Sequence, residues 1–329
     1  MKKVLLLWYF EEDNFGDILL YRTTRNFLAE HNIITISYEV GQPCMDIFHE
    51  ANKTDFLLFA GGGIIERGVP NVIRHFQEDY YLLQVPYGVI GLGVADWDYS
   101  KYKEEIGFWI DHSEFFFVRD DYSENRLFEL VGKNKATCST DCVFHNRDLL
   151  KYGNRIGFDV GINLRDLPFK ERTGDIDDAV IRKIYEECNV SCIIPDASEE
   201  QLEKLVGVDN SDLLIKYRLM DRGEKVEAII NEIRGCQFLI AMRFHVILVS
   251  AVLGVLPIPI IYHEKVRSLV HSLGLDDLSV EINEFAKIPD KLILAKNNRE
   301  AYLEKINEKV NHHREIADSM YSDIAHYFF

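Results

Sequence analysis

The sequence predicts an α/β protein built from two parallel-sheet domains, and three observations support this fold class. Apolar runs of strand length alternate along the chain with runs of helix length. Several of the apolar runs lead directly into glycines or charged side chains, as expected where parallel strands end at a ligand site. The length of 329 residues also suffices for two domains of ordinary size.

The stretch from Phe238 to Lys265 has the clearest strand–helix–strand pattern. Phe238–Ala241 and Ile258–Ile261 are short apolar runs of strand length. Between them, Phe244–Leu253 is longer and closes on Gly254, which is typical of a buried helix with a glycine C-cap. The pattern predicts two parallel strands joined by a right-handed crossover.

Basic side chains follow both of these strands. Arg243 and His245 come after the first strand, where the helix begins, and Lys265 comes after the second. The carboxyl ends of parallel strands bind ligands, and a helix N-terminus favours negative charge. We therefore expect a phosphate or carboxylate ligand here, although the same residues also fit ordinary surface and cap positions.

The first half of the chain contains one series of strands and two candidate ligand loops. Expected strands are Val4–Tyr9, Ile34–Val40, Asp55–Ala60, Tyr87–Val94, Phe115–Val118 and Thr137–Thr140. The loop candidates are Asn14, Gly16 and Asp17 after the first strand, and Gly61, Gly62 and Gly63 after the third. Asn14 or Asp17 also fits a helix cap, and a plain turn is the more common explanation for three glycines. Ser123 or Asp121 is expected to cap a later helix.

The second half repeats the pattern after a polar stretch at residues 145–155, which gives domains 1–150 and 151–329. Expected strands are Ile156–Asn163, Cys192–Ile194, Leu213–Tyr217, Phe238–Ala241 and Ile258–Tyr262, with helices near 176–187, 199–206, 225–235 and 244–253. A long helix is expected from Arg299, and we expect it to cross back to the first domain. Its apolar face consists of Leu303, Ile306, Val310, Ala317, Met320 and Ile324.

Composition argues against several functional classes. A net charge of −17 disfavours a general nucleic-acid or anionic-membrane surface. No uncharged apolar run is long enough to span a membrane. The apolar start is short and meets Glu11, Glu12 and Asp13, so we expect a first strand and a cytoplasmic protein, free or peripheral to the inner face of the membrane. The six cysteines lack zinc or redox spacing, which predicts buried free thiols and no metal.

Six motifs, in this order, resemble those of the polysaccharide pyruvyltransferase family. They are Asn14–Asp17, Gly61–Gly63, Val118–Ser123, Asp141–Phe144, Arg243–His245 and Tyr262–Lys265, and they span nearly the whole chain. Four residues depart from the family pattern. Ile18 replaces a common Glu, Cys142-Val143 replaces Pro-Ala, and Phe244 replaces a common Leu.

The resemblance implies a GT-B-like fold, with two Rossmann-type domains facing a cleft. It also implies transfer of the enolpyruvyl unit of phosphoenolpyruvate to a sugar of a polysaccharide or glycan precursor, forming a ketal and releasing phosphate. Arg119, Arg243 and Lys265 are then expected to bind this co-substrate, with no further cofactor. The loops of the first domain are expected on the acceptor side. Lipid-linked and nucleotide-linked acceptors both fit, and the oligomeric state is not readable from the sequence.

This chemistry assigns a role to His245. Ketal formation needs a proton at the methylene carbon, and imidazole titrates near neutrality, so His245 is the expected general acid. Arginine offers two parallel donors to a phosphate or carboxylate. Asp17 is a candidate for orienting or deprotonating the acceptor hydroxyl.

Two other functions fit the same residues. A nucleotide-sugar glycosyltransferase of the same architecture would use the second-domain cations to hold a diphosphate. A non-catalytic anion- or glycan-binding protein would use them for recognition alone, with His245 as a hydrogen-bond donor.

Overall fold

The structure is a computed structural model that describes residues 1–8, 14–39, 42–65, 69–132, 135–152, 157–164, 178–194 and 222–328. The chain divides into two compact units. The first comprises Met1–Glu12, Asp17–Asn146 and His313–Phe329, and the second comprises Asp13–Gly16 and Arg147–His312. The chain therefore passes from the first unit to the second between Asn146 and Arg147. The sequence analysis placed this boundary four residues later, after residue 150. No helix in the described part of the chain has the length and apolar character needed to cross a membrane.

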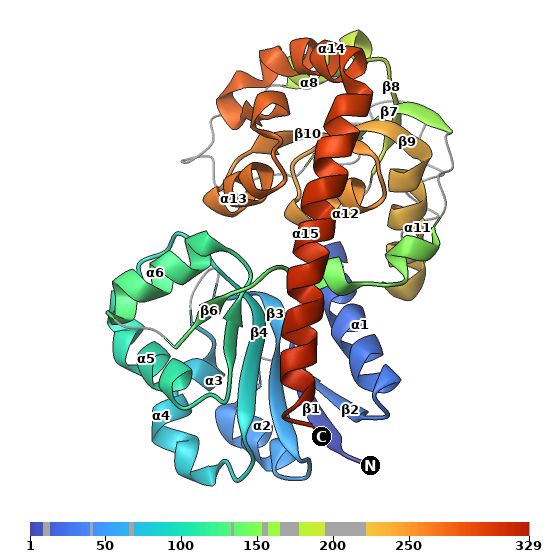
Figure 1. Cartoon of the computed structure of the whole chain (residues 1–329). Helices are drawn as coiled ribbons and strands as arrows, with labels where there is room; N and C mark the ends of the chain where they lie inside the picture. The colour runs from blue at the N-terminus through green and yellow to red at the C-terminus, as the bar shows by residue number, and fades with distance from the viewer. Residues whose placement is uncertain are drawn as a thin grey trace. The chain divides into compact units, whose positions relative to one another are not determined.

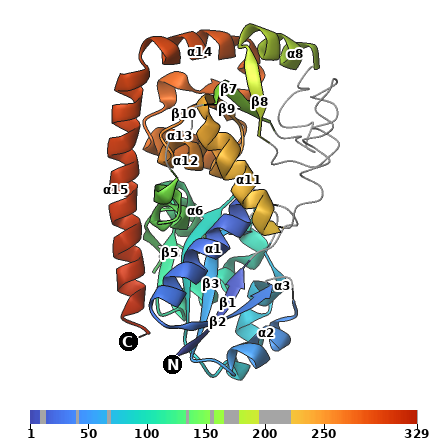
Figure 2. The ribbon, with the colours of Figure 1, turned by 90° about the vertical axis from the view of Figure 1, so that its right-hand side faces the viewer.

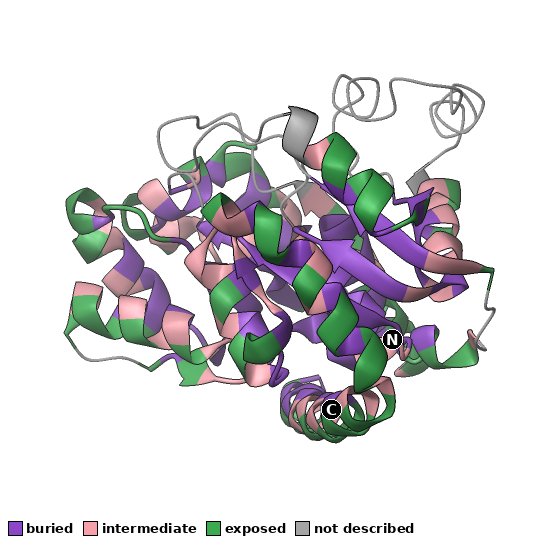
Figure 3. Ribbon diagram, turned by 90° about the horizontal axis from the view of Figure 1, so that it is seen from above, coloured by how far each residue is buried: buried purple, intermediate pink, exposed green. Residues whose placement is uncertain are grey.

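The first unit is built around a parallel sheet (Figure 1). Its described strands lie in the order β2-β1-β3-β4-β5-β6, and every pairing is parallel. The strands are β1 (Lys3–Trp8), β2 (Ile34–Glu39), β3 (Phe56–Ile65), β4 (Tyr87–Val94), β5 (Phe116–Val118) and β6 (Thr137–Cys138). The inner strands are buried on both faces, as the continuous apolar runs predict (Figure 3).

Helices cover both faces of this sheet. α1 (Phe15–Glu30) lies over β1 and β3 in Figure 2, and α2 (Cys44–Ala51) lies on the opposite face. The core on the α2 face is centred on Trp109 of α5 (Lys103–Asp111), which is fully buried and lies edge-on to Phe59 with ring centroids 5.2 Å apart. Further helices are α3 (Asn71–Arg74), α4 (Phe76–Asp79) and α6 (Asp121–Val131).

The three glycines lie inside β3 rather than after it. The sequence placed the end of this strand at Ala60, but β3 continues to Ile65 and pairs Gly62 with Leu92 of β4. Gly61 and Gly62 have φ angles of +53° and +77°, and the register shifts between Gly62 and Ile65. The expected boundary was wrong because glycine allows a bulge within a strand as readily as a turn after it.

The second unit contains another parallel sheet, whose described strands lie in the order β11-β10-β9-β7-β8. The strands are β7 (Phe158–Asn163), β8 (Val190–Ile193), β9 (Cys236–Ala241), β10 (Leu256–Ile261) and β11 (Val280–Glu281). The helices of this unit are α8 (Asp178–Glu187), α11 (Arg222–Gly235), α12 (Phe244–Val252), α13 (Glu264–Ser272) and α14 (Ile288–Asn297). Two parallel α/β units confirm the predicted fold class.

The predicted strand–helix–strand pattern is confirmed as β9, α12 and β10, with the two strands paired in parallel. Gly254 follows α12 with a φ of +72°, as the expected C-cap requires. The sequence analysis missed β11 and α14. The expected helix 199–206 and strand Leu213–Tyr217 lie outside the described residues.

The last long helix, α15 (Arg299–Ala325), begins in the second unit and ends in the first, as predicted. Of its predicted apolar face, Leu303 is half-buried and the other five residues are buried. Within the first unit, the Tyr321 hydroxyl lies 3.0 Å from Thr24 Oγ1 of α1. Phe328, beyond the helix, lies edge-on to Phe56 at 5.2 Å. The C-terminal residues therefore complete the core of the first unit.

Candidate functional site

Arg243 lies where β9 ends and α12 begins. Its backbone is extended, with φ −71° and ψ 130°, so it is the N-cap residue of α12. The residue is half-buried. This is the strand-end position that the sequence predicted, beside the positive end of a helix dipole, and it suits an anionic ligand.

A buried asparagine fixes the turn that carries Arg243, and the sequence analysis did not single it out. Asn163 ends β7 and is fully buried. Its Oδ1 accepts a hydrogen bond from the Arg243 amide at 3.2 Å, and its Nδ2 donates to the Ile194 carbonyl at 3.2 Å. Its backbone carbonyl accepts from the Met242 amide at 3.1 Å. A polar amide at the end of an apolar strand was the available signal, since buried amides need partners.

His245 is the second residue of α12, and its ring lies directly on Gly16. A Cβ atom at Gly16 would be 1.9 Å from His245 Nδ1, so the imidazole occupies the space that any other side chain would need. Gly16 and His245 belong to the same unit. The Gly16 amide donates to Asn14 Oδ1 at 3.0 Å, which identifies Asn14 as the residue that caps the start of α1. The structure thus brings together the expected general acid and the first ligand loop.

Lys265 occupies the corresponding position after the neighbouring strand. It is the second residue of α13, and its amide donates to the Nδ1 atom of His263, the N-cap residue, at 3.2 Å. Because β10 pairs with β9, Lys265 and Arg243 follow adjacent parallel strands. A lysine, an arginine and a histidine beside two helix N-termini suit an anion with more than one charged group.

Asp17 lies against Gly62 of β3 in the first unit. It is in the first turn of α1 and is 9% exposed. A Cβ atom at Gly62 would be 3.4 Å from Asp17 Oδ1, and the Leu20 side chain fills the space beside Gly61 and Gly62. Gly63 is half-buried. The predicted acceptor-side residues Asp17 and Gly62 are therefore neighbours within this unit.

Arg119 is 6% exposed, and two aspartates of its own unit compensate its charge. Its Nε lies 3.3 Å from Asp120 Oδ2, and its Nη1 lies 4.0 Å from Asp141 Oδ2. The guanidinium packs on Gly93, where a Cβ atom would be 2.3 Å from Cζ. These contacts stabilise the first unit, and contact of Arg119 with the donor stays a prediction.

Asp120 also accepts from the Ser123 amide at 2.7 Å, so Asp120 caps α6. The sequence analysis expected Ser123 or Asp121 as the cap, which was wrong, because the N-cap is Asp120 and both expected residues lie within the first turn of α6. Ser123 instead accepts from the Val94 amide at 3.0 Å through its hydroxyl oxygen, which links α6 to the end of β4.

Cys142 fills a space beside two glycines, Gly61 within β3 and Gly91 within β4. A Cβ atom at Gly91 would be 2.5 Å from its Sγ, and one at Gly61 would be 3.6 Å away. Burial raises the pKa of the Cys142 thiol to about 12. The thiol is therefore protonated near neutral pH and packs as a small apolar group rather than acting as a nucleophile.

A family model described as polysaccharide pyruvyl transferase matches residues 14–264. The match begins at Asn14, includes Asp17, Arg119, Arg243 and His245, and ends one residue before Lys265. The chain belongs to the polysaccharide pyruvyl transferase family. No curated protein matches it at a significant level.

Solved structures with a fold similar to that of this chain include GT-B enzymes. A putative UDP-N-acetylglucosamine 2-epimerase from Listeria monocytogenes has 13% identity and a TM-score of 0.58 over 99% of this chain and 96% of that one. UDP-GlcNAc 2-epimerase from Neisseria meningitidis, bound to UDP-GlcNAc, has 12% identity and a TM-score of 0.58 over 98% of both chains. An alpha-glucosyltransferase in complex with UDP and DNA has 8% identity and a TM-score of 0.53 over 96% of this chain and 95% of that one. Such low identity shows the fold alone, and it confirms the predicted GT-B-like class.

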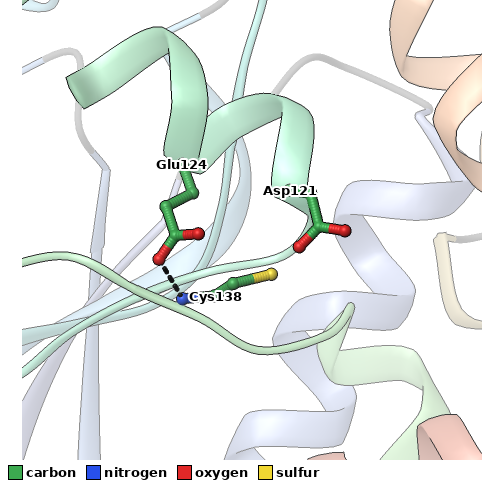
Figure 4. Close-up of side chains that lie close together, drawn as sticks. All are labelled: Asp121, Glu124 and Cys138. Carbon is green, nitrogen blue, oxygen red and sulfur yellow. Dashed lines mark hydrogen bonds between the residues drawn. The ribbon is translucent and has the colours of Figure 1, made fainter. Parts of the chain in front are cut away.

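The first unit also holds a group of potential metal ligands, Asp121, Glu124 and Cys138 (Figure 4). Their ligand atoms lie within 4.8 Å of one another, and Glu124 Oε1 accepts from the Cys138 amide at 3.0 Å. Burial, followed by the hydrogen bond to Asp121, raises the pKa of the Cys138 thiol. Asp121 and Glu124 lie in the first turn of α6, where acidic residues stabilise a helix by themselves. The group is explained without a metal.

Proposed function

We propose that this protein transfers a pyruvyl group from phosphoenolpyruvate to two hydroxyls of a sugar, forming a ketal and releasing phosphate. Within a family of polysaccharide pyruvyl transferases, one observation supports the proposal most. Arg243, His245 and Lys265 lie at the carboxyl ends of the adjacent strands β9 and β10, each at the start of a helix.

The second-unit residues match the charges of this donor. Phosphoenolpyruvate carries a carboxylate and a phosphate on a three-carbon frame. Arg243 presents two parallel N–H donors to one of these groups, and Lys265 presents a point charge to the other. The N-termini of α12 and α13 add backbone N–H groups that favour the same negative charge.

The reaction requires one proton donor and two nucleophilic hydroxyls. His245 donates a proton to the methylene carbon, which becomes a methyl group and leaves a cationic centre at C2. The first sugar hydroxyl attacks C2 and loses its proton. Phosphate then leaves with the electrons of its C–O bond, and the second hydroxyl attacks and loses its proton, which closes the ketal. Asp17 is the candidate that orients or deprotonates an acceptor hydroxyl.

Calorimetric titration with phosphoenolpyruvate tests the donor. We expect wild-type protein to bind it and Arg243→Ala to bind at least about tenfold more weakly, since a charge-assisted hydrogen bond contributes about 1.5–3 kcal/mol. Arg267→Ala is the matched control. Arg267 lies two residues beyond Lys265 on α13, but it is exposed and paired with Glu264 and Glu281. Equal binding by wild type and Arg243→Ala would contradict the donor assignment.

A nucleotide-sugar glycosyltransferase is the second candidate, because several similar structures contain UDP or UDP-GlcNAc. The same calorimetry with uridine diphosphate separates the two. Binding of uridine diphosphate without phosphoenolpyruvate favours the glycosyltransferase. Phosphoenolpyruvate binding without phosphate release, across a panel of glycan acceptors, favours a non-catalytic binding protein.

A further inference from the structure

We propose that Asn163 is a positioning residue for the anion site and that it acts through Arg243 and His245. The identity of the anion rests on the function proposed above, whereas the positioning rests on the hydrogen bonds of the second unit. Asn163 is fully buried, so it acts by holding the backbone that presents those two side chains.

Asn163 connects the ends of three neighbouring strands. It ends β7, which lies between β8 and β9 in the sheet. Its side chain joins the Ile194 carbonyl, just after β8, to the Arg243 amide, just after β9, and both distances are 3.2 Å. Its own carbonyl receives the Met242 amide at 3.1 Å. The turn between β9 and α12 is thus held by two successive hydrogen bonds from one residue.

The start of α12 depends on this support. Its N-cap residue is Arg243, which makes no side-chain capping bond of the kind that Ser, Thr, Asp or Asn provides. The hydrogen bonds from β7 therefore fix where α12 begins. Because His245 is the second residue of the helix, any shift of this turn moves the imidazole together with Arg243.

Only a side-chain amide satisfies both partners at this position. Oδ1 must accept from an N–H group, and Nδ2 must donate to a carbonyl oxygen. Leucine has a similar volume but leaves the Arg243 amide and the Ile194 carbonyl without the side-chain partner. Aspartate keeps the acceptor for Arg243 but places a second oxygen against the Ile194 carbonyl. Leucine therefore removes both side-chain hydrogen bonds, whereas aspartate removes only the one to Ile194.

The experiment compares Asn163→Leu and Asn163→Asp with wild type and with Ser250→Ala. Ser250 is an equally buried polar residue of α12, and its hydroxyl donates to the Val246 carbonyl within the helix, away from the turn. Amide hydrogen exchange of Met242 and Arg243 reports the turn directly. Calorimetry with phosphoenolpyruvate, at a temperature where every variant is folded, reports the site.

We expect faster exchange at Arg243 in Asn163→Leu, retained protection there in Asn163→Asp, and no change in Ser250→Ala. Phosphoenolpyruvate should bind about 10- to 100-fold more weakly to both Asn163 variants, because a misplacement of about 1 Å can cost about 100-fold. Ser250→Ala should bind it like wild type. A merely structural role for Asn163 predicts lower thermal stability with unchanged affinity in the folded variants.

Folded Asn163→Leu protein that keeps wild-type exchange at Arg243 and wild-type affinity would overturn the inference. Absence of phosphoenolpyruvate binding by wild type would instead overturn the proposed donor. In that case the exchange comparison still decides whether Asn163 holds the turn. Titrations with uridine diphosphate and inorganic phosphate then decide whether the turn controls anion binding, and equal affinity of wild type and Asn163→Leu for both would again overturn the inference.

Discussion

Replacing Gly16 by alanine tests whether His245 must lie where the structure places it. The new Cβ atom would be 1.9 Å from Nδ1, 2.5 Å from Cγ and 2.7 Å from Cε1 of the ring. Non-bonded heavy atoms rest at about 3.5 Å, so the imidazole has to move by roughly 1.5 Å. Since a displacement of about 1 Å at a reacting group can cost about 100-fold, we expect the turnover number to fall by at least about 100-fold.

The same substitution leaves the helix itself unstrained. The φ angle of Gly16 is outside the left-handed region, and alanine is favoured over glycine in helices by about 0.5–1 kcal/mol. Loss of activity is therefore expected while α1 remains folded, as circular dichroism and calorimetric unfolding can verify. Gly107→Ala in α5 is the matched control, because its nearest neighbour would be Val131 Cγ1 at an ordinary 3.6 Å.

The assay is phosphate release from phosphoenolpyruvate with an acceptor that supports turnover by wild type. Gly107→Ala should retain wild-type turnover. If Gly16→Ala, fully folded, turned over within about threefold of wild type, the position of the His245 ring would not limit the reaction. The assignment of His245 as the general acid would then lose its geometric support.

Two further predictions concern buried groups of the first unit. Arg119→Met leaves both partner aspartates without their buried cation and should lower the free energy of unfolding by about 3–5 kcal/mol, as measured by urea denaturation; a loss below about 1 kcal/mol would contradict the structural role. The raised pKa of Cys142, about 12 against an ordinary 9.0, means that the unfolded chain loses this proton first. Its contribution to stability is complete below about pH 9 and is lost as the pH rises towards about 12, by at most about 1.4 kcal/mol per pH unit. The free energy of unfolding, measured with urea, should therefore fall more steeply with rising pH for wild type than for Cys142→Ala. Parallel dependences on pH would refute the raised pKa of Cys142.

The strand–helix series was predictable from the sequence because each long apolar run forms one buried strand or helix. The run Phe244 to Leu253 has helix length, and Gly254 marks its end without reference to any other part of the chain. The positions of Arg243, His245 and Lys265 followed from the same local reading. A residue that follows a strand in the sequence lies where the carboxyl ends of the parallel strands meet, whichever strands are its neighbours.

The features that were missed depend on contacts between distant segments. The register shift between Gly62 and Ile65 belongs to the pairing of β3 with β4, which the sequence of β3 alone does not reveal. The ion pair of Arg119 with Asp141 was also missed, because Asp141 lies beyond the following helix; binding of the donor by Arg119 stays a prediction. Asn163 was passed over because its importance comes from two strands that are adjacent to β7 only after folding. Two-residue β11 is too short for any periodic signal.

The path of α15 has a consequence for how the protein is made. Most of the first unit is synthesised before the second, yet its core includes Tyr321, Ile324 and Phe328, which are synthesised after the second unit. Until these residues are made, Phe56 lacks its edge-on contact with Phe328, and Thr24 lacks its contact with the Tyr321 hydroxyl. Synthesis stopped near His312 would leave a second unit with most of its residues and a first unit with an uncovered apolar face, which marks incomplete chains for chaperones and proteases.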